Sequence, residues 1–151
     1  MGGYMSKNIT IPTDEDGFVL LQCHICGEYF KLLASEINDD STINIWCPYC
    51  GLNGKQYAPK EVIENAIKIA ENEFNEIIYN AFKKMEKETK NSLIQFKCNK
   101  KPALKDIPPI KVRIDKLELQ NYKCCNSMAK IQPISKMCGS YCPICGGINY
   151  E

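Results

Sequence analysis

The longest periodic pattern of apolar residues in this chain lies between residues 60 and 90. The apolar positions recur in steps of four and three, the spacing of one face of an α-helix. They are Ile63, Ile67, Ala70, Phe74, Ile77, Ala81 and Met85, flanked by Val62, Ala66, Ile69 and Ile78. A helix over 60–90 would be about 45 Å long. Because one small module cannot cover such a length, we expect the stripe to pack on the rest of its own chain, on a protein partner or on a second copy.

Shorter apolar runs before this helix predict strands. Residues 18–21 and the mainly apolar residues 28–33 are expected to form the two strands of a hairpin, and a turn is expected at 13–17 in front of them. A polar break at 38–41 precedes the run 42–46, which predicts a third strand. The runs 18–21 and 42–46 each lead into a Cys-x-x-Cys pair. The pattern therefore predicts a small antiparallel sheet that carries two cysteine turns.

The pattern beyond the helix is similar but less regular. Residues 97–109 contain three prolines and four lysines but few apolar residues, which indicates a loop or linker. Apolar and charged residues then alternate over 110–114, as in a half-buried strand. Further strands are expected near 129–134 and 147–150. The second half therefore predicts another small antiparallel module.

Cysteine spacing indicates why such small modules can fold. Two Cys-x-x-Cys pairs separated by 20 residues match the spacing of a four-cysteine zinc site. The second pair reads Cys-Pro-Tyr-Cys-Gly, in which proline presets the turn and Gly51 can adopt the positive φ that ends it. The expected ligands of this first site are Cys23, Cys26, Cys47 and Cys50.

A second site is expected near the C-terminus, where Cys-Pro-Ile-Cys-Gly recurs. Its expected ligands are Cys124, Cys125, Cys142 and Cys145. Adjacent side chains of a strand point to opposite faces, so both Cys124 and Cys125 can reach one metal only where the backbone turns sharply. Cys138 replacing one of them is the alternative, and Cys98 is a more distant one.

The ligand set favours zinc. Four thiolates suit zinc or an iron–sulfur centre, and the sequence alone leaves iron open. A shell filled by four cysteines is typical of a structural site, because catalytic zinc keeps one position for water or substrate. His24 is the only histidine and is left out of the ligand set. With no acid–base or nucleophile constellation evident, we expect a protein that is not an enzyme, holding two structural zinc ions.

The chain resembles a bacterial double zinc-ribbon family. The resemblance rests on Asp16-Gly17-Phe18, on the first Cys-x-x-Cys followed by Phe30-Lys31, on Cys-Pro-Tyr-Cys-Gly, on the helix, and on the divergent C-terminal cysteines. Individual ribbons are similar to the transcription factor IIB type. The resemblance implies a small zinc-stabilised α+β fold, with two antiparallel zinc ribbons joined by a long amphipathic helix. Zinc binding is implied too, whereas a role in transcription is not.

The expected organisation follows from these elements. Residues 1–58 form the N-terminal zinc ribbon, 59–92 the amphipathic helix, and 93–151 a basic linker with the divergent C-terminal ribbon. No secretory leader and no run as long as a membrane span are evident, so we expect a cytoplasmic protein whose thiols stay reduced.

The charge pattern offers an alternative function. The net charge is only +1, but residues 1–82 carry −7 (5 Lys against 12 acids) and residues 83–123 carry +7 (12 Lys or Arg against 5 acids). The first expectation is a non-catalytic accessory subunit that binds a protein partner, with no small-molecule substrate. The alternative is nucleic-acid binding through the basic segment 97–123. Its candidate contacts are Lys100, Lys101, Lys111, Arg113 and Lys116.

Overall fold

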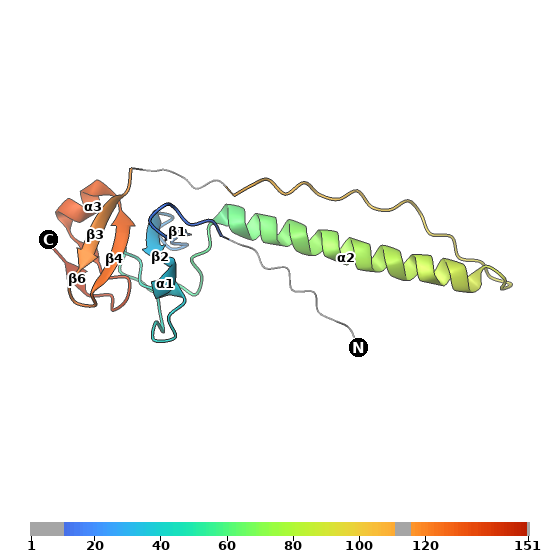
Figure 1. Ribbon diagram of the computed structural model, residues 1–151, viewed down its shortest axis with the longest axis horizontal. Helices are drawn as coiled ribbons and strands as arrows, with labels where there is room; N and C mark the ends of the chain where they lie inside the picture. The colour runs from blue at the N-terminus through green and yellow to red at the C-terminus, as the bar shows by residue number, and fades with distance from the viewer. Residues whose placement is uncertain (1–10, 111–115, 151) are drawn as a thin grey trace. The chain divides into compact units, whose positions relative to one another are not determined.

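The computed structural model describes residues 11–110 and 116–150. The chain divides into two compact units, one made of residues 1–62 and 110–151, the other of residues 63–109. The first unit is a small α+β domain with antiparallel sheets, and most of the second is one long helix (Figure 1). None of the helices in the described ranges combines the length and the apolar character that crossing a membrane requires.

A four-stranded antiparallel sheet is the centre of the first unit. Its strands are β1 (Phe18–Gln22), β2 (Tyr29–Leu33), β3 (Glu118–Tyr122) and β4 (Ser127–Ile131), in the spatial order β1-β2-β4-β3. Each hairpin pairs two strands that are close in sequence, and Leu32 of β2 then lies opposite Ala129 of β4. The N-terminal and C-terminal hairpins therefore form one continuous sheet.

The same series of elements follows both hairpins. A short helix comes next, α1 (Ala34–Ile37) after β2 and α3 (Pro133–Cys138) after β4. A Cys-x-x-Cys turn comes after the helix, and the residues on its two sides pair in antiparallel orientation. Trp46 pairs with Asn53 in the first half, and Tyr141 pairs with Ile148 in the second. The second pairing belongs to β5 (Ser140–Tyr141) and β6 (Ile148–Asn149). The first unit is thus a hairpin–helix–turn arrangement that occurs twice.

Two strand predictions need correction. The expected strand at 42–46 is irregular apart from the single bridge of Trp46, and Ile43 is 89% exposed, so no apolar face holds this segment against the sheet. The expected strand at 129–134 ends at Ile131, because Pro133 starts α3 in the first-turn position that proline favours. The expected strand at 110–114 lies almost wholly outside the described residues.

The core of the first unit is formed by the inner face of the sheet. Phe30, Leu32, Tyr122 and Ile131 are fully buried, two from each hairpin. The Phe30 ring meets Tyr57 edge-on, with ring centroids 5.8 Å apart, an arrangement that aromatic pairs prefer. Because the core takes side chains from both hairpins, each half stabilises the other.

Charged residues tie the strands together on the sheet. The Asp14 carboxylate lies 3.3 Å from the buried Lys31 Nζ on β2 and 2.9 Å from the Lys130 Nζ on β4. Its Oδ1 also accepts a hydrogen bond from the Phe18 N–H at 2.9 Å. Partial burial raises the pKa of this carboxyl, but the hydrogen bonds from Lys130, Phe18 and Lys31 outweigh it and lower the pKa from 3.8 to about 2.

Asp14→Asn is expected to lower the free energy of unfolding at pH 7 by about 2 kcal/mol, the equivalent of this pKa shift. Because the folded-state pKa is depressed, the contribution is complete above pH 4 and disappears as the pH falls towards 2. Urea unfolding of both proteins at pH 7 measures the difference. Asp16→Asn is the matched control, since that side chain is 69% exposed and also contacts Lys130. Equal effects of the two substitutions would contradict the assignment.

The long helix was expected at 60–90, and α2 runs over Lys60–Thr89. In the second unit, residues 96–108 lie along one face of this helix (Figure 1). The Asn65 side chain donates to the Pro108 carbonyl at 2.8 Å, and the Asn72 amide makes two hydrogen bonds with the Lys105 backbone, at 2.8 and 3.0 Å. The segment expected to be a linker is therefore held against the helix by asparagine side chains.

Candidate metal centres

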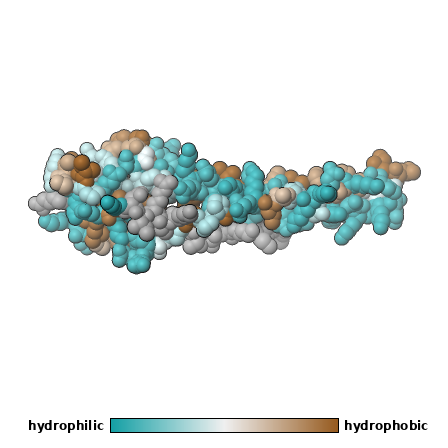
Figure 2. Space-filling model, turned by 90° about the horizontal axis from the view of Figure 1, so that it is seen from above, coloured by the Kyte–Doolittle hydropathy of each residue, from teal (hydrophilic) through white to brown (hydrophobic). Residues whose placement is uncertain are grey.

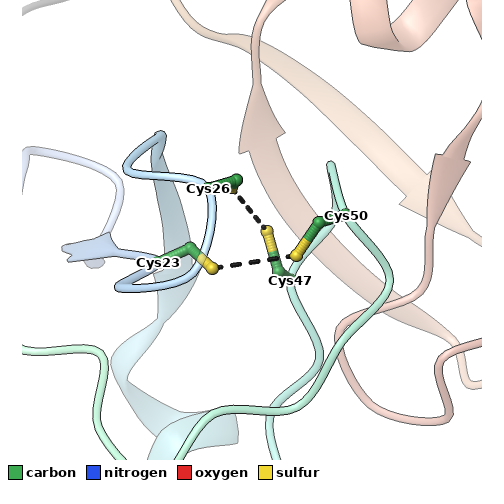
Figure 3. A group of neighbouring side chains, drawn as sticks. All are labelled: Cys23, Cys26, Cys47 and Cys50. Carbon is green, nitrogen blue, oxygen red and sulfur yellow. Dashed lines mark hydrogen bonds between the residues drawn. The ribbon is translucent and has the colours of Figure 1, made fainter.

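The first group of cysteine thiols gathers between the β1–β2 turn and the turn that follows Trp46. Cys23 and Cys26 come from the hairpin, Cys47 and Cys50 from the second turn (Figure 3). All four sulfur atoms lie within 4.8 Å of one another. The Cys23 and Cys50 sulfurs are 3.8 Å apart, and the Cys26 and Cys47 sulfurs 3.6 Å.

These distances fit a tetrahedral metal shell. With a zinc–sulfur distance of about 2.3 Å, the sulfurs of a regular tetrahedron are about 3.8 Å apart. Disulfide-bonded sulfurs would be only about 2 Å apart, and the thiols of this group are free. The first group can therefore hold one metal ion without rearrangement of its backbone.

Glycines shape the two turns of the first group. Gly27 and Gly51 follow the second cysteine of each pair and have φ values of 79° and 68°, which glycine adopts at little cost. Their N–H groups donate to the carbonyls of Cys23 and Cys47, at 2.8 and 2.9 Å. The turn that results brings the Tyr49 N–H to 3.4 Å from the Cys47 sulfur, where it can stabilise a thiolate.

The second group is formed by Cys124, Cys125, Cys142 and Cys145, again with all sulfurs within 4.8 Å of one another. The Cys124 and Cys145 sulfurs are 3.6 Å apart. Asn126 has a φ of 50°, the left-handed conformation that asparagine tolerates, so the chain turns sharply directly after the adjacent cysteines. This turn lets the adjacent side chains of Cys124 and Cys125 reach the same centre, which the ligand set predicted from the sequence requires.

The other thiols and the histidine lie apart from these groups. Cys138 is exposed at the end of α3, and Cys98 belongs to the second unit. The His24 Nε2 lies 3.1 Å from the Ala58 carbonyl oxygen rather than among the sulfurs. Among the described residues, the two groups that can hold metal are thus built entirely from cysteine.

The two groups differ in their exposure to solvent. In the first, Cys23 and Cys47 are fully buried; in the second, only Cys142 is. Burial and neighbouring thiols raise the pKa of Cys124 to about 11 and that of Cys125 to about 12. The Gly147 N–H, in contrast, lowers the pKa of Cys145. Crowded thiols resist carrying several negative charges together, and a divalent cation at the centre removes this repulsion.

The two metal centres contact each other through equivalent residues. The Trp46 N–H donates to the Pro143 carbonyl at 2.8 Å, and the Tyr141 N–H donates to the Pro48 carbonyl at 2.9 Å. Trp46 and Tyr141 each directly precede the cysteine of a Cys-Pro-x-Cys-Gly turn. Each turn is therefore anchored on the other, and the two metal groups form one assembly.

Aromatic rings complete this mutual contact. A Cβ added to Gly146 would lie 2.7 Å from Cδ2 of the Trp46 ring, and a Cβ added to Gly51 would lie 2.8 Å from Cε1 of the Tyr141 ring. Such distances are closer than carbon atoms normally approach. Each ring thus packs directly on the glycine of the other turn, a relationship that the recurring motif did not reveal.

The basic residues proposed as nucleic-acid contacts belong to different units of the chain. Lys100 and Lys101 are exposed in the second unit, where the Lys101 Nζ lies 3.7 Å from the Glu76 carboxylate. Lys116 is exposed in the first unit, and Lys111 and Arg113 lie outside the described residues. Nucleic-acid binding stays a prediction.

The fold and the sulfur groups together define a small α+β protein with two four-cysteine groups, each able to hold a metal ion. Comparisons with protein-family models, with curated proteins and with solved structures found no match. The relationship to a double zinc-ribbon family therefore stays a prediction, and the function has to be inferred from the residues themselves.

Proposed function

We propose that this chain is a non-catalytic zinc protein in which two structural zinc ions support a small accessory subunit for protein–protein interaction. The observation that carries the proposal is the pair of four-thiol groups, in which three pairs of sulfur atoms lie 3.6 to 3.8 Å apart, as in a tetrahedral zinc shell. The reduced thiols suit a cytoplasmic location.

The structural role follows from the ligands and from their position. Four thiolates fill a tetrahedral shell and leave no coordination position for substrate, as in structural zinc sites. Each group also joins a sheet hairpin to a following turn, so that a bound metal closes segments separated by about 20 residues. A domain with this small a core usually needs such support in order to fold.

The interaction role is supported by the long helix. Phe74 and Ile77 are 62% and 67% exposed and belong, with Ile67 and Met85, to a row of exposed apolar side chains along the helix, the kind of patch that marks an interaction surface. Residues 96–108 lie along one face of the helix, and the exposed apolar side chains of the other face are available to a partner.

Cobalt substitution tests the metal proposal. Co²⁺ in a tetrahedral thiolate site has intense sulfur-to-metal charge-transfer bands, and we expect the reconstituted protein to show them at two equivalents of metal per chain. Removing a ligand of one site, by Cys26→Ser or Cys145→Ser, should reduce these bands. Cys98→Ser and Cys138→Ser are the controls and should leave the spectrum unchanged. Absence of thiolate bands in a folded protein, or their loss in the controls, would contradict the proposed ligand sets.

A further inference from the structure

Two faces of α2 have different environments. The face that includes Asn65 and Asn72 is covered by residues 96–108, and further along the helix the Phe82 ring packs on Phe96, with centroids 5.5 Å apart. At 100° per residue, the apolar stripe lies on the opposite side of the helix. Within the second unit, one face of α2 is thus already occupied and the other is not.

The uncovered face is named here the outer stripe, and its described members include four large side chains. Ile67, Phe74, Ile77 and Met85 are 54%, 62%, 67% and 46% exposed. Figure 2 shows apolar atoms interspersed along the helical part of the molecule. The stripe starts at Ile63, contains Ala70 and Ala81 between these large residues, and extends about 33 Å along the helix axis.

From these features we infer that the outer stripe binds the outer stripe of a second copy in antiparallel orientation, with the two-fold axis near Phe74. This inference rests on the proposed role of α2 as an interaction surface and names its partner. A two-fold interface brings the same surface of both copies together, so the stripe must be complementary to itself.

Size complementarity favours the antiparallel arrangement. About Phe74, residue n of one copy is level with residue 148 − n of the other. Ala81 then faces Ile67, Ala70 lies beside Ile78, and Ile63 faces Met85. A parallel pair would instead place Ala70 against Ala70 and Ala81 against Ala81, leaving gaps that cost packing energy. Both alanines of the stripe therefore face larger side chains only when the helices run in opposite directions.

Charge favours the same orientation. Residues 63–76 contain four acids and one lysine, a net of −3, whereas residues 77–90 contain four lysines and two acids, a net of +2. Lys101 and Lys105 pair with Glu76 and Glu71 on the covered side. In an antiparallel pair the acidic segment 63–76 of one copy comes alongside the basic segment 77–90 of the other. A parallel pair would bring like charges together at both ends.

Sedimentation of the zinc-loaded full chain tests the pairing. At about 100 µM, where a micromolar association is close to saturated, we expect a dimer that dissociates on dilution. Phe74→Ser should leave a monomer at the same concentration, because it removes the central contact from both copies at once. The control is Ile94→Ser, since Ile94 is 82% exposed in the same unit but lies outside the stripe.

Zero-length carbodiimide cross-linking of a mixture of isotopically light and heavy protein tests the orientation. Mixed light–heavy products form only between copies. We expect the mixed products of the wild type to join carboxylates of residues 63–76 to lysines of residues 77–90, and we expect their loss in Phe74→Ser. Mixed products that join two sites within 63–76, or two sites within 77–90, instead would overturn the antiparallel arrangement.

Metal content separates this inference from the proposed function. A chain that contains two zinc ions and stays monomeric at 100 µM, or a dimer that Phe74→Ser leaves intact, would overturn the pairing of stripes and leave the zinc proposal standing. A dimer that lacks zinc would overturn the zinc proposal and leave the pairing standing.

Discussion

Cys47→Ser is expected to unfold the first unit. The Cys47 sulfur is fully buried in the first metal group, and serine is a poor ligand that leaves the remaining three thiols without a closed shell. Structural zinc contributes about 10–16 kcal/mol at neutral pH in small zinc domains, which is at least as large as the total stability of about 5–15 kcal/mol of an ordinary domain. Loss of one ion is therefore sufficient to remove the native state of this unit.

Trp46 reports this change directly. It is the only tryptophan of the chain, it precedes Cys47, and its ring packs against Gly146. We expect the emission of Cys47→Ser to shift to the wavelength of solvent-exposed tryptophan, and its cooperative thermal transition to disappear. Cys138→Ser is the control, because that thiol is exposed at the end of α3 and outside both groups. A native emission spectrum and a cooperative transition in Cys47→Ser would contradict a structural role of the first group.

The second large effect is expected for Gly146→Ala. Gly146 has a φ of 73°, and an added Cβ would lie 2.7 Å from the Trp46 ring. The unfavourable backbone conformation and the overlap with the ring together are expected to lower the free energy of unfolding by about 3–4 kcal/mol. Because Trp46 adjoins the first metal group and Gly146 the second, both zinc ions should also dissociate more readily from the variant.

Gly27→Ala is the matched control for this prediction. Gly27 has a similar φ of 79°, but an added Cβ would meet nothing within 4 Å. It should therefore show the conformational cost alone, about 1–2 kcal/mol. Chemical denaturation of the two zinc-loaded variants gives the comparison. Equal destabilisation would mean that the contact between Gly146 and Trp46 contributes nothing, and that the two metal centres do not support each other.

Local patterns were sufficient to predict much of the sheet and the metal groups. The apolar runs at β1 and β2 are five residues long and pair with a neighbour in sequence, so period and turn residues specify them. The Cys-x-x-Cys spacing likewise confines both sulfur atoms of a pair to one turn. The helix expected at 60–90 was predicted to within a residue at each end, because its apolar repeat runs from Val62 to Met85 and covers most of its 30 residues.

Contacts between distant segments could not be predicted in this way. The pairing of Leu32 with Ala129 joins residues almost a hundred positions apart, and nothing in either strand specifies that partner. Asn65 and Asn72 look like ordinary polar positions of a helix, yet their amides bind the backbone of residues 105–108. The strand expected at 42–46 shows the opposite failure, because its residues alternate as in a strand but only Trp46 makes a bridge and Ile43 is exposed.

The adjacent cysteines 124 and 125 lie between these cases. Strand geometry argued against both thiols reaching one centre, and the decision depended on a turn that the residues permit but do not require. The φ of 50° at Asn126 supplies that turn. Asparagine is one of the few residues that tolerate this conformation, so the residue after a cysteine pair is where such a site can be recognised in a sequence.

Native mass spectrometry of the intact chain tests the central claim most directly, because it counts the metal ions bound to each folded molecule. We predict a single dominant species with two zinc ions per chain. Complete removal of zinc by a chelator should move the charge-state distribution to that of an unfolded protein, and returning zinc should restore it. A metal-free chain that keeps the compact charge-state distribution would contradict the claim that two zinc ions hold this fold together.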